Sequence, residues 1–404
     1  MGTGNRPPDR RAGPFTGLSR NVVVLSWVSF FQDAASEMLY PVLPLFLTGV
    51  LGAPPSVVGL IEGLAEGTAS VMKAVSGRLA DIRRRRPLVA AGYGISSLSK
   101  LVIGFATGWP LVLVARFADR FGKGLRTSRD ALIAADTAPE HRGRAFGFNR
   151  ALDTAGAVVG PLAGLALYEA LDHRIRPLFF VAFVPAAASV ALIGLVREPV
   201  TPPVHRNARQ LRGPLPRRYW RVVVFLTLFG LANFSDALLI LRVKALGLSF
   251  VEIILAYALY NVSYAILSYP AGVLSDRVPR RIVFATGLGI FAAAYIGLGA
   301  VTSAGWVWFL LPLYGGYTAL TDGVGKAWVA DLLPEERVGS GLGFYQGLAG
   351  GAALLAGVWA GLAWGSSGRL PLLVSGVVVA GLAGVLLVAG DRLERGGVRS
   401  RVPA

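Results

Sequence analysis

Long apolar runs follow one another along almost the whole chain. A helix needs about 20 consecutive apolar residues to cross the hydrocarbon core of a bilayer. Twelve windows of the sequence reach this length, and short polar or Gly- and Pro-containing connections separate them. The windows are 21–48, 56–80, 87–107, 110–134, 145–170, 177–197, 221–246, 250–275, 281–301, 305–331, 342–364 and 370–390. The pattern predicts an all-α membrane protein with twelve transmembrane helices.

A duplicated motif divides these windows into two sets of six. The segment at Gly77 reads Gly-x-Leu-x-Asp followed by arginines, and the same form returns at Gly272, 195 positions later. A second pattern, around Asp136, returns at Asp331 with the same spacing. A repeated membrane chain is typical of transporters. We predict two pseudo-symmetric six-helix bundles, with an N-terminal tail at 1–20, bundles at 21–197 and 221–390, a basic linker at 198–220 and a C-terminal tail at 391–404.

The basic residues collect on one side of the predicted membrane. Lys and Arg total 40 against 23 Asp and Glu, which gives a formal net charge of +17. These residues stand at the ends of apolar runs rather than on an amphipathic face, so we expect no nucleic-acid partner. The positive-inside rule makes both termini and the linker cytoplasmic, and only Arg174, Arg176 and Arg369 depart from the pattern. We expect a monomeric, multi-pass protein of the cytoplasmic (inner) membrane.

The composition also limits the chemistry. The chain has no cysteine, and its three histidines (His141, His173 and His205) all fall in predicted connections. We therefore expect neither a metal site nor a cofactor. The tetrad 365–368 reads Gly-Ser-Ser-Gly, as in intramembrane serine proteases, but no histidine lies in any window to act as its base. We expect no enzymatic activity.

The windows, the repeat, the basic central loop and the motif together resemble the major facilitator superfamily over the whole chain. That resemblance implies alternating access, in which two bundles rock about a central site. It also implies a cytoplasmic latch, in which the motif carboxylate pairs with arginines of a neighbouring helix; the alternative is a solvated helix end that follows the positive-inside rule. The matching residues are Gly77, Asp81, Arg85 and Arg86 in the first half, and Gly272, Asp276 and Arg277 in the second.

The fifth window carries a glycine and proline pattern. Gly156, Gly160, Pro161 and Gly164 resemble the antiporter motif of the same superfamily. Glycines four positions apart let two helices approach closely, and a proline bends a span. The resemblance implies antiport.

Ionisable residues inside the windows are functional candidates, because a charge at bilayer depth is costly unless it is paired or hydrated. Carboxyl groups of the first, second, seventh and tenth windows could carry a proton, since burial favours the protonated form. Cations of the fourth window could meet an anionic group; alternatively, they pair with acidic neighbours as static supports. The candidates are Asp33, Glu37, Glu62, Glu66, Arg116, Arg120, Lys123, Arg126, Asp236 and Asp322.

The leading hypothesis is a secondary active transporter for a small solute. We favour proton-coupled export of a drug-like compound or small organic anion, with Asp33, Glu37 and Glu66 in proton or substrate binding and Arg116 and Lys123 in substrate contact. A metal ion or metal-chelate (siderophore-type) transporter is the alternative within this class. A non-transporting membrane receptor or scaffold is the alternative of another class.

Overall fold

Helices make up the regular structure of the chain in the computed structural model. The model describes residues 18–82, 85–126, 128–137, 142–197, 215–334 and 337–394, and no strand occurs in these ranges. The helices of the first half are α1 (Arg20–Leu39), α2 (Val42–Gly49), α3 (Pro55–Ile82), α4 (Arg85–Phe105), α5 (Trp109–Leu125), α6 (Ser128–Ala135), α7 (Arg142–Ala170) and α8 (Arg176–Ile193). Those of the second half are α9 (Arg217–Ala232), α10 (Asp236–Ala245), α11 (Phe250–Arg277), α12 (Arg280–Ala300), α13 (Val307–Asp331), α14 (Val338–Leu362) and α15 (Arg369–Glu394), with a short 3-10 helix at Ala304–Trp306. They form the predicted twelve membrane-crossing segments in two sets of six.

Nine of the segments are long and apolar enough to cross a membrane by length and composition alone, within the described residues. The other three are α3, α5 and α13. Each of these carries ionisable residues in its interior, among them Glu62, Arg116 and Asp322. The helices that fit a lipid environment least well are therefore those that hold the candidate functional groups.

The expectation of continuous helices is wrong for three windows. The first is broken between α1 and α2, where Pro41 lacks the backbone N–H that a helix interior requires. The seventh is broken between α9 and α10, where the Ser235 hydroxyl accepts a hydrogen bond from the Ala237 N–H (3.3 Å) and begins a new helix. The fourth ends as α5 at Leu125 and restarts as α6. The first and seventh breaks stand at equivalent places in the two halves.

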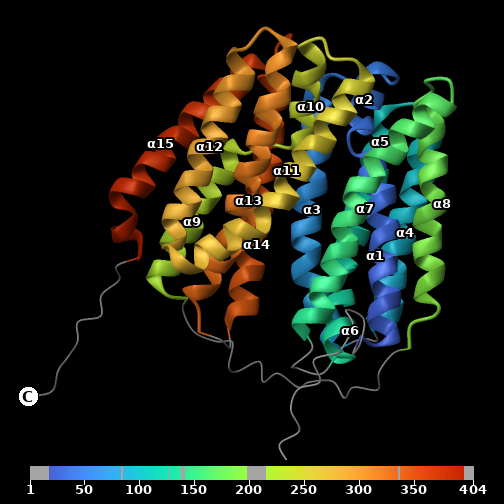
Figure 1. Cartoon of the computed structure of the whole chain (residues 1–404), viewed down its shortest axis with the longest axis horizontal. Coiled ribbons are helices and arrows are strands. Elements are labelled where there is room, and N and C mark those ends of the chain that lie inside the picture. The colour runs from blue at the N-terminus through green and yellow to red at the C-terminus, as the bar shows by residue number, and fades with distance from the viewer. Residues whose placement is uncertain are drawn as a thin grey trace, which may run out of the picture.

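Each half is a bundle of its own helices (Figure 1). In the first half α1 packs against α7 and α8, while α5 packs against α3 and α4. In the second half α12 packs against α13 and α15, and α11 packs against α13. The halves meet mainly through α3 against α14, with a smaller contact of α7 against α11. The exact boundaries of the two bundles stay a prediction, and most of the linker lies outside the described residues.

The contact between α3 and α14 brings two backbones together. A Cβ on Gly59 would lie 2.1 Å from the carbonyl oxygen of Gly357, so neither position has room for a larger residue. The contact continues to Ser70, whose Cβ lies 2.4 Å from the place of a Cβ on Gly350. The following α3 side chains, Val71 and Val75, are 56% and 39% exposed.

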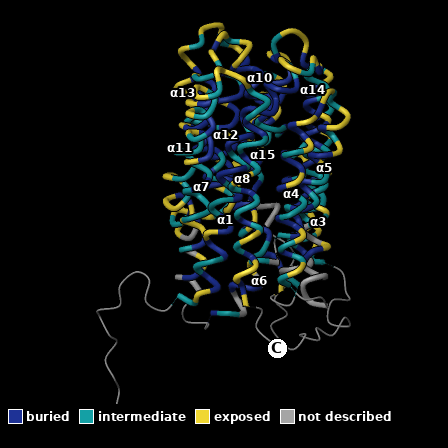
Figure 2. The backbone as a smooth tube through the Cα atoms, turned by 90° about the vertical axis from the view of Figure 1, so that its right-hand side faces the viewer, coloured by how far each residue is buried: buried dark blue, intermediate teal, exposed yellow. Residues whose placement is uncertain are grey.

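This contact lies toward the end of the molecule that holds α2 and α10, which we name the α10 end; the opposite end holds α6 (Figure 1). Two aromatic pairs join the halves there. Tyr40 stacks on Tyr257 with 5.5 Å between ring centroids, and Tyr168 stacks on Phe250 at 3.9 Å. Exposed positions gather on the outward faces of the helices and on the loops of the α10 end (Figure 2).

Two of the arginines that depart from the positive-inside pattern donate hydrogen bonds to carbonyl groups at the ends of helices. Arg176 donates to the carbonyl oxygens of Gly104 (2.9 Å) and Ala106 (2.7 Å) at the end of α4. Arg369 donates to the carbonyl of Gly299 (3.0 Å) near the end of α12. A cation is favourable where the last carbonyls of a helix have no partner of their own. These two charges are therefore explained by helix capping.

Candidate functional site

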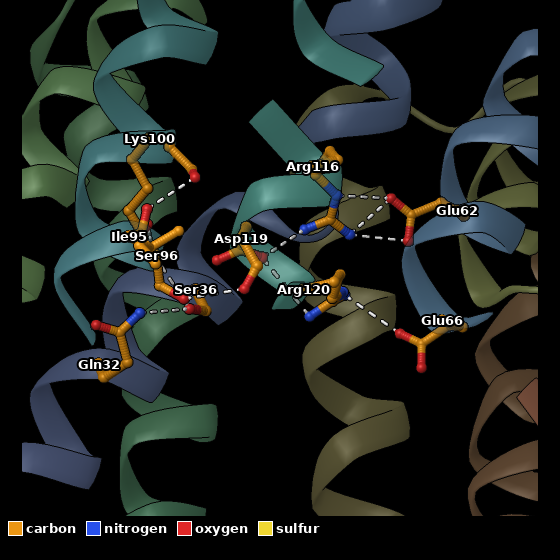
Figure 3. A network of polar contacts seen from close by, with 11 residues as sticks. Gln32, Ser36, Glu62, Glu66, Ile95, Ser96, Lys100, Arg116, Asp119 and Arg120 are labelled. Atoms are coloured by element: carbon orange, nitrogen blue, oxygen red, sulfur yellow. Dashed lines mark hydrogen bonds and ion pairs between the residues drawn. The ribbon is translucent and has the colours of Figure 1, made fainter. Parts of the chain in front are cut away.

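An ionic network runs from α5 to α3 inside the first half (Figure 3). The Arg116 guanidinium donates to both carboxylate oxygens of Glu62, from Nη2 to Oε1 at 2.6 Å and to Oε2 at 2.8 Å. Its Nε makes a further bond of 3.0 Å to Oε1. Both residues are buried. A charge-assisted bidentate pair of this kind fixes geometry as well as compensating charge.

Asp119 and Arg120 extend the network toward Glu66. The Asp119 carboxylate lies between two arginines, 3.4 Å from Arg116 Nη1 and 3.8 Å from Arg120 Nη1. Arg120 Nη2 is 3.4 Å from the Glu66 carboxylate, which is 42% exposed. Asp119 Oδ1 and Arg120 Nε are buried without a hydrogen-bond partner among the described residues. The network therefore has polar atoms left over for a ligand or solvent.

Lys100 of α4 brings a further buried cation to the same place. Its ammonium donates to the Ser36 hydroxyl (3.4 Å) and the Ser96 carbonyl (3.3 Å) and is 5% exposed. It lines a cavity of about 360 Å³ with Tyr40, Arg116 and Asp119. This cavity is the first candidate binding space, on the first-half side of the interface.

A cluster of tyrosines surrounds Asp236 in the second half. The Tyr314 hydroxyl donates to one carboxylate oxygen of Asp236 at 2.7 Å, and the Tyr260 hydroxyl donates to the other at 3.2 Å. Tyr260 and Tyr314 stack with their centroids 5.4 Å apart. With Tyr257 and apolar side chains of α10, α11 and α13, they line a cavity of about 310 Å³. This cavity is apolar and aromatic with one acidic group.

Each cavity has one aromatic ring at the interface between the halves. Tyr40 lines the first cavity, Tyr257 lines the second, and the two rings stack on each other. Glu37 of α1 accepts a hydrogen bond from the Tyr257 hydroxyl at 2.9 Å, which links the halves at this point. A molecule that reached both cavities would contact both bundles.

A second polar cluster lies where α1 meets α7. Asp33 lies beside the Asp153 carboxyl group, within hydrogen-bonding range. Asp153 in turn is 3.5 Å from Arg129 and 3.3 Å from Arg150. The Arg129 guanidinium also donates to the Ser29 hydroxyl. Asp33 therefore contacts another carboxyl group, that of Asp153, and Asp153 makes the ion pairs with the arginines.

The glycine motif of the fifth window allows α7 to pack closely against α1. A Cβ on Gly156 would stand 2.5 Å from the Phe30 carbonyl oxygen, and one on Gly160 would stand 2.5 Å from that of Ala34. Gly164 faces Met38 in the same way, with a Cβ 2.9 Å from the Met38 Cγ. Pro161 stays inside α7. The motif packs α7 directly on the part of α1 that carries Asp33 and Glu37.

The other predicted residues stand apart from the cavities or outside the described side chains. Arg126 lies over the Tyr93 ring at 5.1 Å, and Lys123 is half-buried in the last turn of α5. Asp322 pairs with Lys326 at 2.6 Å, with 43% of its side chain exposed. The described residues contain no group of three or more His, Cys, Asp or Glu placed to hold a metal ion.

The predicted latch falls partly outside what the structure describes. The surroundings of Gly77 and the side chains of Asp81 and Asp276 lie outside what is described, so the pairing of the two carboxylates stays a prediction. Of the remaining latch residues, Arg86 donates to the carbonyl of Gly194 at 2.7 Å, while Gly272 and Arg277 are exposed and Arg85 is half-buried. The other repeated pattern contributes an ion pair within the second half, Asp331 with Arg280 at 2.5 Å.

Sequence reasoning missed three parts of the site: Lys100, Asp153 and the tyrosine cluster. A lysine inside the third window was a signal of the same kind as the chosen carboxylates. Asp153 stands three positions before Gly156 of the antiporter-like motif. The tyrosines recur at helical spacing (257, 260 and 264; 314 and 317), but aromatic residues in a span are common enough to give no separate signal.

The family follows from a match that covers the chain. The family model described as Major Facilitator Superfamily matches residues 25–241 and 222–403. The chain belongs to the Major Facilitator Superfamily. It is 32% identical over 380 residues to an uncharacterized MFS-type transporter of Methanocaldococcus jannaschii, across 92% of this chain and 95% of that protein. The chain is therefore a transporter-family membrane protein, as the resemblance predicted.

More distant relatives include the quinolone resistance protein NorA of Staphylococcus aureus. It is 24% identical over 284 residues, which cover 69% of this chain and 66% of NorA. Among solved structures, the nucleoside transporter NupG is similar with a TM-score of 0.73 and 13% identity, over 94% of this chain and 100% of NupG. A POT family transporter in complex with a conjugated peptide gives a TM-score of 0.78 at 12% identity, over 95% and 99% of the two chains. These structures share the fold.

Proposed function

We propose that this protein exports a small drug-like compound or organic anion across the cytoplasmic membrane in exchange for protons. It works as a monomer by alternating access, with both termini in the cytoplasm and the two bundles rocking about the paired cavities. In this assignment the α10 end faces away from the cytoplasm. The likeness to NorA and the glycine motif on α7 support export by antiport.

Proton coupling is inferred from a difference among the carboxylates that the structure describes: some have an arginine within 4 Å and others do not. Glu62, Glu66 and Asp119 each lie within 4 Å of an arginine, so protonating them would break an ion pair. Among the described residues, Glu37 has a tyrosine hydroxyl as its hydrogen-bond partner, and Asp33 faces another carboxyl group. A carboxylate next to a hydroxyl or a like charge can take up and release a proton without leaving a cation unpaired. We therefore assign the coupling protons to Asp33 and Glu37 and the structural charges to the arginine-paired groups.

The position of Glu37 connects its proton to the contact between halves. Its partner Tyr257 belongs to α11 and also stacks on Tyr40 of the first half. A change in the charge of Glu37 alters a hydrogen bond that spans the interface, which is the element that alternating access must open and close.

The test is substrate accumulation driven by an imposed proton gradient in proteoliposomes. With an acidic lumen, antiport predicts that a fluorescent quinolone accumulates inside as protons leave. The variants Glu37→Gln and Asp33→Asn should lose gradient-driven accumulation by about tenfold or more, while still exchanging labelled for unlabelled substrate. Glu252→Gln is the matched control, because Glu252 is an exposed helix-capping residue at the start of α11 whose capping role glutamine keeps. Accumulation that ignores the gradient, or that requires an alkaline lumen, would contradict proton antiport.

A further inference from the structure

The cavity beside Lys100 contains a buried cation that makes no ion pair within 4 Å among the described residues. Among the described residues, no carboxylate lies within ion-pair distance of the Lys100 ammonium, which has only the Ser36 hydroxyl and the Ser96 carbonyl as acceptors. Both bonds are long, at 3.4 and 3.3 Å. A buried cation in a membrane protein is costly without a counter-charge. The Lys100 ammonium could therefore bind an anionic group of a ligand.

The other charged groups that line this cavity are in ion pairs, although Asp119 keeps one carboxylate oxygen, Oδ1, without a hydrogen-bond partner among the described residues. Arg116 is held by Glu62 on two sides, and Asp119 lies between Arg116 and Arg120. The Tyr40 ring lines the same cavity next to Lys100. An incoming carboxylate would thus meet one ammonium that has no ion-pair partner within 4 Å among the described residues, beside an aromatic ring.

The cavity around Asp236 offers the opposite chemistry. Asp236 faces two tyrosine hydroxyls and, among the described residues, no cation lies within 4 Å of it. The tyrosine rings provide aromatic faces around this anion. A carboxylate among aromatic rings is the setting that recognises an organic ammonium group.

The two spaces adjoin across the stacked rings of Tyr40 and Tyr257, one from each half. We infer that the substrate is amphoteric: an aromatic compound whose anionic group binds Lys100 and whose ammonium group binds Asp236. The inference rests on the proposed transport function and names the substrate class of the same site. It makes one molecule the bridge between the two bundles.

The test is equilibrium binding to the full-length protein in detergent, with three probes built on one scaffold. The amphoteric probe is 6-(aminomethyl)-2-naphthoic acid; its methyl ester keeps only the amine charge, and its N-acetyl derivative keeps only the carboxylate. The amphoteric probe should bind at least about tenfold more tightly than either derivative. No binding of the amphoteric probe at about 1 mM, or equal affinities for the three, would overturn the inference.

Substitutions at the two ends should separate the three probes. Lys100→Met should weaken the amphoteric and N-acetyl probes about tenfold and leave the ester within about twofold, while Asp236→Asn should weaken the amphoteric probe and the ester instead. Lys100→Arg, which keeps the charge, should preserve binding if Lys100→Met fails to fold. Lys244→Met and Asp172→Asn are the matched controls, because both residues are exposed. A Lys100→Met protein that binds the N-acetyl probe like the wild type would contradict the assignment.

The flux assay of the proposed function shows which hypothesis has failed, the amphoteric substrate or the proton-coupled export. Gradient-driven quinolone accumulation with no preference among the three probes would overturn the amphoteric substrate and leave proton-coupled export in place. Probe discrimination without gradient-driven accumulation would support the binding site and contradict the coupling.

Discussion

The two halves of the molecule share a backbone plan but place different chemistry at equivalent positions. Glu62, Lys100 and Asp119 of the first half correspond, 195 positions later, to Tyr257, Tyr295 and Tyr314. Tyr257 and Tyr314 belong to the tyrosine cluster, and the Tyr295 ring lies 5.7 Å from that of Tyr314. Helix bounds follow the same spacing, as in α3 (Pro55–Ile82) and α11 (Phe250–Arg277). At these three positions the duplication has kept a polar side chain and changed its chemistry, whereas Arg116 and Arg120 correspond to Leu311 and Gly315.

Because of this difference, we expect single substitutions to affect the stability of the two halves differently. Charges buried together stabilise each other only as a complete set, and loss of one leaves another uncompensated. Tyrosine hydroxyls are neutral and lose only a hydrogen bond when removed. The first half should therefore respond sharply to single substitutions and the second half mildly.

The largest effect is expected at the Arg116 and Glu62 pair. Arg116→Met leaves the Glu62 carboxylate buried without its bidentate partner and should lower the free energy of unfolding by about 3–5 kcal/mol. Adding Glu62→Gln should recover part of that loss, because the stranded charge is gone. Unfolding of the purified proteins in detergent checks this. A double variant no more stable than the single one would show that the pair does not act as a unit.

A smaller effect is expected in the tyrosine cluster. Tyr314→Phe removes the 2.7 Å hydrogen bond to Asp236 and should cost about 1.5–3 kcal/mol in the same unfolding assay. Tyr295→Phe is the matched control, since its hydroxyl contacts the Phe234 carbonyl at 3.5 Å and the Tyr314 hydroxyl rather than Asp236. Equal losses in the two variants would mean that the bond to Asp236 adds no stability.

The smallest effect concerns helix packing at equivalent glycines. Gly156→Ala places a Cβ 2.5 Å from the Phe30 carbonyl and should destabilise the protein by about 1–3 kcal/mol as α1 and α7 separate. Gly351 stands 195 positions later with open space around it, so Gly351→Ala should be neutral or slightly stabilising, since alanine favours a helix. Similar thermal stabilities of the two variants would remove this contrast between the halves.

The fold was open to prediction because hydrophobic length and the internal repeat are both local properties of the sequence. The predicted window 250–275 falls within α11, and the duplicated Gly-x-Leu-x-Asp motif related the halves correctly. The break at Pro41 had a local signal in the proline, whereas the break before Ser235 depended on a cap that only the folded chain makes evident.

The site was harder to predict, because pairing depends on which helices meet. The sequence named Glu62 and Arg116 separately, but their bidentate contact joins positions 54 apart on different helices. Arg116 and Lys123 as substrate contacts stay a prediction; the structure adds that Arg116 has two acidic partners and that Lys100 lines the same cavity. Which of several buried charges lacks a partner is a property of the packed bundle.

The central claim is that Asp33 and Glu37, which make no ion pair with an arginine among the described residues, carry the coupling proton. The most direct measurement is the reverse of gradient-driven accumulation: a substrate gradient is imposed across proteoliposomes with no pH difference, and a trapped pH-sensitive dye reports proton movement. The account predicts that quinolone leaving the lumen draws protons in, and that Glu37→Gln abolishes this movement while Glu252→Gln does not. Quinolone flux with no proton movement in the wild type, or with undiminished movement in Glu37→Gln, would contradict it.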